Sequence, residues 1–183
     1  MKITRSMVRR AGWWSLALLF AATTIVALVY FFWAGQKPPA PVTAKCSYKP
    51  GTLMQSGGDN PLKNTKLVNF TSVSNVDFLR CEDFKIGTGT AVKAGSSVTV
   101  QYIGAVAATG TIFESTLDSG QPATFSLDQT IPGFSTGLLG MKAGGERRIL
   151  IPAQYAYGAG PPQGSGIPSN ADLVFDISLL FVQ

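Results

Sequence analysis

The chain offers few of the side chains that usually carry out enzymatic chemistry. It contains no histidine, and its two cysteines are Cys46 and Cys81. Without an imidazole no Ser-His or Cys-His mechanism can operate, and two cysteines cannot complete a structural zinc site. Residues 133–137 match the G-x-S-x-G nucleophile elbow, but that motif requires a preceding buried parallel strand and a later histidine. The composition leaves a binding module, a membrane component, or an enzyme that uses neither a metal nor an imidazole.

The elements that would position a site lie in residues 77–183. Alternation of apolar and polar residues between turn signals predicts strands at 97–103, 111–115, 123–127, 146–151 and 171–182. In the last stretch the odd positions from Leu173 to Phe181 are all apolar and Asp176 lies on the other face, which predicts a sheet with one side buried. Only residues 133–141 suit a helix. The predicted fold class is α+β, a single twisted antiparallel sheet packed on one short helix.

Positive charge is concentrated at the N-terminus. Four of the 15 Lys and Arg residues lie within the first ten positions, and no acidic residue accompanies them. The residues after Ala34 contain 11 basic and 10 acidic side chains, a net charge of +1. A nucleic-acid-binding domain should carry a basic stripe, so we expect no nucleic-acid partner.

Residues 11–34 form an uninterrupted uncharged run that predicts a membrane anchor. As a helix the run would be roughly 36 Å long, which is enough to cross a hydrocarbon core of about 30 Å. A cleaved signal peptide is the alternative, but its apolar region should be about 7–15 residues long and be followed by small residues. By the positive-inside rule, residues 1–10 are a cytoplasmic basic segment and everything after residue 34 is extracytoplasmic. We therefore expect a single-pass protein of the cell membrane, in contact with the lipid bilayer through residues 11–34.

A linker separates the predicted anchor from the folded domain. Residues 35–76 are rich in Pro, Gly and Asn, and we expect a spacer followed by an irregular extension packed loosely against the domain. Outside the cytoplasm two cysteines can form a disulfide and stay oxidised. A Cys46–Cys81 disulfide would join the extension to the start of the domain, and two unpaired thiols remain the alternative.

Five sequence blocks occur in order within the domain: VTVQYIG (98–104), IFES (112–115), TIPGF (130–134), GLLGMKAGGERRILIPAQYAYG (137–158) and IPSNADLVFDISLL (167–180). On these blocks, roughly residues 84–183 resemble the FKBP-type peptidyl-prolyl cis-trans isomerases, the family that binds macrolide immunosuppressants. The resemblance implies a curved antiparallel sheet wrapped around one short helix. It also implies no cofactor and no metal, with proline-containing polypeptides as substrates and macrolides as possible inhibitors.

The resemblance further implies a pocket for a proline ring, with aromatic walls and Phe134 as its floor, where most members have a tryptophan. The implied catalytic residues are Tyr102, Phe113, Glu114, Ile131, Phe134, Tyr157 and Phe175. The implied substrate-binding residues are Tyr102, Phe113, Thr130, Ile131, Phe134, Tyr157, Ile167 and Phe175. Glu114 replaces the usual aspartate, and Ala123 stands where many members have another phenylalanine. We assign Phe125 and Phe181 to the core.

Such a pocket needs no nucleophile, which suits the residues that the chain contains. Rotation about an X-Pro bond costs about 18–20 kcal/mol because amide resonance must be broken. An apolar pocket that removes water from the amide, together with preset hydrogen bonds, would lower this barrier. We therefore predict a peptidyl-prolyl isomerase that assists the folding of exported or surface polypeptides. The substitutions at Phe134, Glu114 and Ala123 motivate an alternative, a membrane-tethered proline-binding module or complex subunit with little or no turnover.

Overall fold

The computed structural model of the chain describes residues 43–51, 53 and 62–183. The predicted basic segment 1–10, the predicted membrane helix 11–34 and the linker as far as residue 42 lie outside the described residues. Within the described ranges, no helix has the length and apolar character needed to cross a bilayer.

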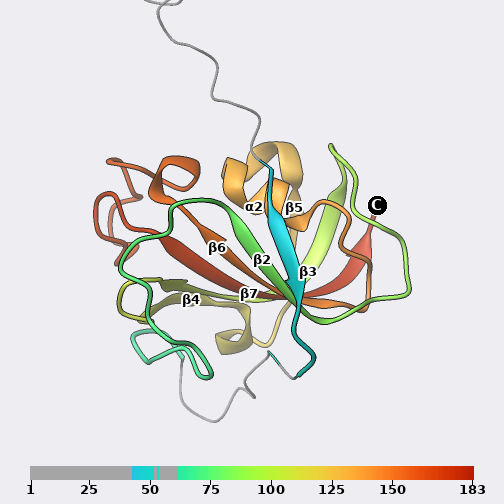
Figure 1. The fold of residues 1–183 in the computed structure, drawn as a ribbon, viewed down its shortest axis with the longest axis horizontal. Helices are drawn as coiled ribbons and strands as arrows, with labels where there is room; N and C mark the ends of the chain where they lie inside the picture. Colours follow the sequence, from blue (N-terminus) through green and yellow to red (C-terminus); the bar gives the residue numbers. More distant parts are fainter. Residues whose placement is uncertain (1–42, 52, 54–61) are drawn as a thin grey trace, which may run out of the picture. The chain divides into compact units, whose positions relative to one another are not determined.

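The described part of the chain is built around one β-sheet (Figure 1). Its strands are β1 (Lys45–Tyr48), β2 (Arg80–Lys85), β3 (Ser97–Val106), β4 (Ile112–Ser115), β5 (Ala123–Ser126), β6 (Glu146–Ile151) and β7 (Leu173–Val182). They are ordered β1-β2-β6-β7-β3-β4, and β5 also pairs with β3. The short helices are α2 (Pro132–Leu138) and three 3-10 turns, η1 (Thr116–Asp118), η2 (Leu127–Gln129) and η3 (Ala153–Tyr155). Every strand pair except one is antiparallel.

The exception is β1, which runs parallel to β2, so the sheet is mixed and the prediction of a purely antiparallel sheet is wrong on this point. We predicted irregular structure at these residues because they show no hydrophobic period. In the structure all four side chains of β1 are exposed, which explains the missing period. Backbone pairing and a disulfide between Cys46 and Cys81 hold this edge strand in place. Strand β2 was not predicted either.

The inner face of the sheet packs on α2 and forms the main hydrophobic cluster. Val98, Val100 and Tyr102 of β3 are buried there, as their alternation predicted. Helix α2 starts with Pro132, whose fixed φ suits a first helical turn, and ends before the predicted residue 141, because Gly140 has φ of +73°. A Cβ atom on Gly137 would lie 2.6 Å from Cγ2 of Ile149, so this glycine allows the helix to approach β6 closely.

The outer face of the sheet is covered as well, which the one-sided pattern of β7 did not predict. Residues 62–76, here called the strap, bury Leu67 and Val76 in a second cluster against Ile103 and neighbouring strand residues. Beneath the strap, Asp176 is fully buried. It pairs with Arg148, whose Nε lies 2.6 Å from Asp176 Oδ1. The predicted solvent position of Asp176 is therefore wrong, because the strap excludes water and Arg148 compensates the carboxylate.

The predicted apolar face of β7 ends before Phe181, which is 55% exposed and is not a core residue. The cause is a register shift opposite β3, where Thr99 pairs with Phe181 but Val100 pairs with Leu179. A bulge of this kind reverses which side chains face inward. Val182 is buried in place of Phe181.

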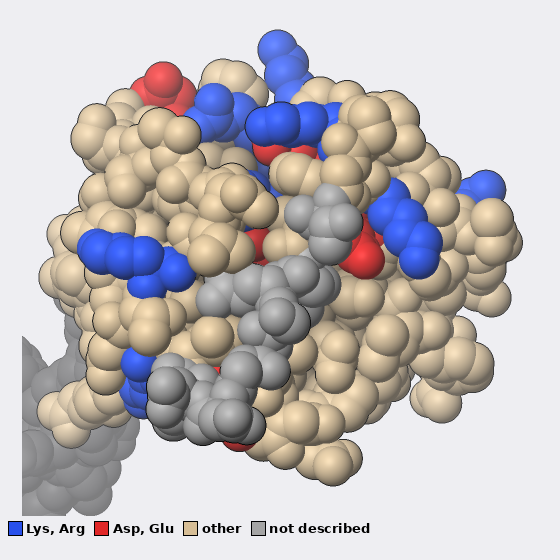
Figure 2. Space-filling model, turned by 90° about the horizontal axis from the view of Figure 1, so that it is seen from below, with Lys and Arg blue, Asp and Glu red and all other residues tan. Residues whose placement is uncertain are grey.

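On the face shown in Figure 2, Lys and Arg side chains are dispersed among uncharged residues. A second ion pair, between Arg147 Nε and Asp83 Oδ1 at 2.6 Å, joins β6 to β2. Arg147 also donates to the Gly137 carbonyl, which ties the end of α2 to the sheet.

Candidate active site

A pocket of about 270 Å³ opens on the inner face of the sheet, among β3, β4, β5, β7, the start of α2 and the loop after η3. Ten residues line it: Tyr102, Phe113, Glu114, Phe125, Gln129, Thr130, Ile131, Phe134, Tyr157 and Phe175. Five of the ten are Phe or buried Tyr rings that come from four strands and the helix. Segments distant in sequence therefore supply one aromatic wall.

The rings pack mainly edge to face, which is a favourable arrangement for aromatic quadrupoles. Phe134 lies at the centre, with its centroid 5.4 Å from that of Phe175 at an interplanar angle of 79°. Tyr102 contacts Phe125, Phe134 and Phe175 at 5.8, 6.5 and 6.2 Å. Phe113 completes the set at 5.9 Å from Phe175. Each ring is held by at least one other, so the wall is fixed before any ligand enters.

A glycine in β3 makes room for two of these rings. A Cβ atom at Gly104 would lie 2.7 Å from Cζ of Phe113 and 3.0 Å from Cε1 of Phe175. Both rings therefore lie across the backbone of β3 at a position where any larger residue would displace them. Gly104 belongs to the block VTVQYIG, and only the structure shows that it positions the walls.

Polar groups lie at the edge of the pocket. The Ile131 carbonyl accepts hydrogen bonds from the N–H groups of Phe134 and Ser135 at 3.0 and 3.2 Å, which orients this peptide at the start of α2. Its own N–H donates to no acceptor among the described residues. The Thr130 hydroxyl donates to the Leu127 carbonyl at 2.9 Å and fixes the turn that leads into the helix. A backbone donor is thus available to a ligand carbonyl.

The two tyrosines of the pocket remain protonated in alkaline solution. Burial is the main cause that raises the pKa of the Tyr102 hydroxyl, and the charge of Glu114 and a hydrogen bond to its carboxylate raise it further. Burial, and then the Glu114 charge, also raise the pKa of the Tyr157 hydroxyl. Tyr157 is 36% exposed, so its hydroxyl is accessible at the mouth of the pocket. Glu114 thereby helps to keep both hydroxyls in the donor form.

The structure brings together eight of the nine residues that the resemblance implied for the pocket: Tyr102, Phe113, Glu114, Thr130, Ile131, Phe134, Tyr157 and Phe175. Ile167 is the exception. It does not line this pocket and packs, half-buried, against the main cluster.

Phe125 and Gln129 line the pocket although the sequence analysis did not place them there. Phe125 was assigned to the core, and its ring in fact faces both Tyr102 and Phe134. The alternation of β5 carried a usable signal, because Phe125 pairs with Val98 and so shares the inner face. Gln129, in the turn η2, left no pattern that could have identified it.

The predicted cysteine pair lies elsewhere. Cys46 and Cys81 are joined in a disulfide between β1 and β2, and neither lines the aromatic pocket. In the part of the chain that the structure describes, no three His, Cys, Asp or Glu side chains are grouped as they would be around a metal ion.

Comparison with known proteins agrees with this architecture. The family model of FKBP-type peptidyl-prolyl cis-trans isomerases matches residues 88–180. Among curated proteins, the chain is 44% identical over 100 residues to the FKBP-type peptidyl-prolyl cis-trans isomerase FkpA of Aeromonas hydrophila, covering 54% of this chain and 36% of the relative. It is 41% identical over 113 residues to FK506-binding protein 4 of Aspergillus fumigatus, covering 61% of this chain and 22% of the relative.

A solved structure shows the same relationship. The crystal structure of FkpA from Escherichia coli superposes with a TM-score of 0.54 at 37% identity, covering 63% of this chain and 52% of that one. The chain belongs to the family of FKBP-type peptidyl-prolyl cis-trans isomerases, whose model covers about half of it. The chain covers only 36% and 22% of the length of these two curated relatives.

Proposed function

We propose that this protein catalyses the cis–trans isomerisation of X-Pro bonds in exported or surface polypeptides while it is anchored to the cell membrane. The observation that supports the catalytic part is the pocket of about 270 Å³, in which five rings surround a space beside an unpaired backbone N–H. Its size and apolar walls suit a proline ring, because rigid aromatic side chains bind at little entropic cost.

The mechanism follows from the lining. The proline ring enters between Tyr102, Phe113 and Phe175, above Phe134. The Ile131 N–H and the Tyr157 hydroxyl donate to carbonyl groups of the bound peptide and fix its orientation. Water stabilises the planar amide more than the twisted one, so an amide surrounded by rings loses less when it rotates. No bond is made or broken, and the enzyme acts by binding the twisted state more tightly than the planar one.

The membrane anchor is supported by sequence features. Residues 11–34 are uncharged and residues 1–10 hold four basic side chains, which favours a cytoplasmic N-terminus and an extracytoplasmic isomerase domain. The Cys46–Cys81 disulfide agrees with an oxidising compartment. Fractionation of cells that express the full chain would test the anchor, and recovery of the uncleaved protein in the soluble fraction would refute it.

Macrolide inhibition is part of the same proposal. Several relatives are named FK506-binding proteins, and a macrolide of that class would occupy the aromatic pocket in competition with a prolyl peptide. Inhibition of turnover by FK506 is the expected result.

The test of catalysis is an isomerisation assay of a proline peptide with the full chain in nonionic detergent. We expect Phe113→Ala to lower kcat/KM strongly, since it removes a wall, and Tyr157→Phe to lower it less, since it removes one hydrogen bond. Phe181→Ala and Tyr155→Phe are matched controls, because these side chains lie outside the lining. If the wild-type protein binds the peptide but gives no acceleration over background, the enzyme hypothesis fails and a tethered binding module remains.

A further inference from the structure

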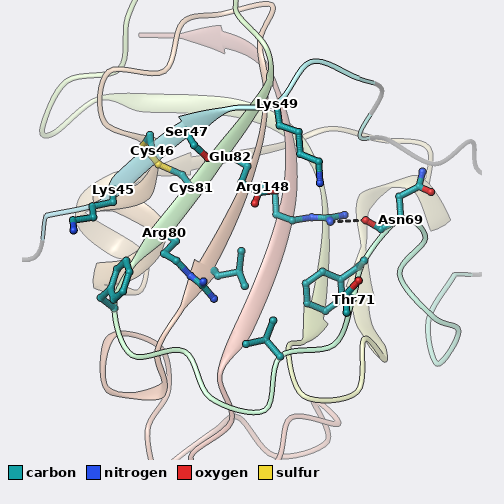
Figure 3. A pocket seen from close by; sticks show the side chains of 14 residues that line it. Lys45, Cys46, Ser47, Lys49, Asn69, Thr71, Arg80, Cys81, Glu82 and Arg148 are labelled. Atoms are coloured by element: carbon teal, nitrogen blue, oxygen red, sulfur yellow. Dashed lines mark hydrogen bonds between the residues drawn. A yellow bond between two sulfur atoms is a disulfide. The ribbon is translucent and has the colours of Figure 1, made fainter.

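A second pocket, of about 380 Å³, lies on the outer face of the sheet and shares no lining residue with the aromatic pocket. It is bounded by the edge strand β1 and its neighbour β2 on one side and by strap residues 69–73 on the other (Figure 3). Lys45, Lys49, Arg80 and Arg148 line it, and Glu82 is the only acidic side chain among its lining residues. Figure 3 shows Arg80 and Arg148 extending from neighbouring strands along the floor of this pocket.

The strand register sorts these charges into two rows. In one row Glu82 lies opposite Arg148, which in turn lies opposite Asp176. Arg148 is held by Asp176 through two hydrogen bonds of 2.6 and 2.7 Å. Glu82 is close enough to Asp176 to contribute to raising the pKa of that carboxyl, although burial is the larger cause. This row is therefore compensated within the protein.

The neighbouring row is not compensated. Lys45 lies directly opposite Arg80, and Arg80 lies opposite Leu150, so two like charges are followed by an apolar residue. Both cations also flank the same ring, with Lys45 Nζ at 5.4 Å and Arg80 Cζ at 5.7 Å from the centroid of Phe78. In Figure 3 the two side chains extend in opposite directions, Arg80 into the pocket and Lys45 toward its rim. A bound anion would therefore meet Arg80 directly and Lys45 at longer range.

No carboxylate of the described residues supplies that anion. Neither Lys45 nor Arg80 forms an ion pair there, and the described part contains nine of the chain's ten Asp and Glu residues. The Nε atom of Arg80 is buried and has no hydrogen-bond partner within the same residues. Leaving a buried donor without a hydrogen-bond partner costs about 1–3 kcal/mol of folding free energy, and a ligand that binds beside Arg80 could offset this cost.

We propose that this pocket binds a phosphate ester, with the phosphate at the Arg80 guanidinium and its organic part on the apolar surface of Phe70, Val73 and Leu150. Arginine binds phosphate oxygens through its planar fork, while lysine adds a point charge. Four cations and one carboxylate line the pocket, and this excess of positive charge favours a doubly charged phosphate over a carboxylate of single charge. The volume lies within the range of about 300–1,000 Å³ typical of small-molecule sites, which leaves room for more than a bare ion.

Phosphate esters could reach this site from two sources, a phospholipid headgroup or a soluble metabolite. Calorimetric titration of the full chain, held in phosphate-free nonionic micelles at constant ionic strength, distinguishes them. The probes are inorganic phosphate, phenyl phosphate, and micelles doped with short-chain phosphatidylglycerol. We expect phenyl phosphate to bind more tightly than inorganic phosphate because of the apolar wall. Saturable binding of the doped micelles would identify the lipid source, and saturable binding of phenyl phosphate alone the soluble one.

Variants give the decisive comparison. Arg80→Gln should weaken binding at least tenfold and Lys45→Gln by a smaller factor, whereas Lys93→Gln, which removes the same charge as Lys45→Gln from an exposed position elsewhere, should change it less than twofold. All three variants should keep the wild-type isomerase activity, because none of these residues lines the aromatic pocket. The proposal is overturned if no probe binds saturably, or if Lys93→Gln weakens binding as much as Arg80→Gln does. A loss of isomerase activity together with unchanged phosphate binding would count only against the proposed function.

Discussion

The two faces of the sheet are both buried, yet they are stabilised by different interactions. On the inner face, rings from four strands and α2 pack edge to face around an open pocket, and the polar groups stay at its edge. On the outer face, an ion pair with hydrogen bonds to the strap lies under residues 62–76, and Arg148 donates to the Asn69 carbonyl at 2.8 Å. Uncharged walls suit a site that must exclude water, whereas a buried charge pair fixes one position of the strap.

The contrast lies mainly in the side chains that the same strands present. Tyr102 and Ile103 of β3 are neighbours in the chain, and one faces the aromatic pocket while the other faces the strap. The same alternation along β7 places Phe175 in the pocket and Asp176 in the ion pair. Substitutions of residues that face the strap should therefore act mainly on stability, and substitutions of their neighbours that face the pocket mainly on catalysis.

The largest effect is expected for Asp176→Asn. It leaves the Arg148 guanidinium buried without a countercharge, and breaking a buried pair in this way typically costs about 3–5 kcal/mol. Urea unfolding should show a loss of this size, while the folded fraction keeps its isomerase activity. Asp128→Asn, at an exposed position, is the control and should change little.

The double variant Asp176→Leu with Arg148→Met sharpens this prediction, since replacing both charges by apolar groups should recover most of the stability. Equal destabilisation by the single and double variants would show that the pair is not what holds the outer face together.

Removal of the disulfide should have the next largest effect. Cys46 and Cys81 are 35 residues apart, and the chain-entropy estimate for such a loop is about 4 kcal/mol at most. The variant Cys46→Ser with Cys81→Ser should unfold at lower urea concentration and become insensitive to reductant, whereas reductant should destabilise the wild type. Isomerase activity of the folded variant should persist, because the bridge lies outside the aromatic pocket. Identical unfolding curves for the wild type with and without reductant would contradict this.

On the inner face, Gly104→Ala should act chiefly on catalysis. The new methyl group would collide with the rings of Phe113 and Phe175, and overpacking of this kind costs about 1–3 kcal/mol. We expect kcat/KM to fall by about tenfold or more as the walls shift, beyond any loss of folded protein. Gly160→Ala is the matched control, since a Cβ there meets nothing within 4 Å. Unchanged kinetics in Gly104→Ala would show that the ring positions do not matter for turnover.

The smallest effect concerns alkaline pH. Burial and Glu114 raise the pKa values of Tyr102 and Tyr157 above the ordinary value of 10.0. The folded state then holds these protons more tightly than the unfolded state. The resulting stabilisation is complete below pH 10 and is lost as pH rises through the folded-state pKa values.

Ultraviolet titration of the tyrosines should therefore show ionisation delayed beyond pH 10, and Tyr102→Phe should remove part of the delayed signal. Glu114→Gln should shift the delayed phase to lower pH, because the carboxylate contributes to both raised pKa values. Titration of Tyr102 at its ordinary pKa would show that water reaches its hydroxyl and that burial does not raise its pKa.

Much of this protein can be understood from its sequence. Period-two alternation predicted strands close to β3 and β6, because it reflects local backbone preferences. The five sequence blocks, through the resemblance that they carry, implied the eight residues that line the pocket. The error at Phe181 concerns which side of a strand faces inward, whereas Phe125 does face inward but lines the pocket as well as packing against the core. A bulge opposite Thr99 decides the orientation of Phe181, and a bulge leaves no mark in apolar alternation.

The amino-acid sequence by itself determined the absence of imidazole chemistry and the α+β class of fold, since residue type and short-range periodicity are sufficient for both. The resemblance carried by its five blocks implied all but one ring of the aromatic wall. The tertiary structure decided the rest: that β1 joins the sheet in parallel, that the strap buries Asp176 with Arg148, and that Lys45 and Arg80 flank the Phe78 ring without an ion-pair partner among the described residues. These features depend on pairing between segments far apart in the chain, and the free energy of such contacts is set by what lies opposite each residue rather than by its neighbours in sequence.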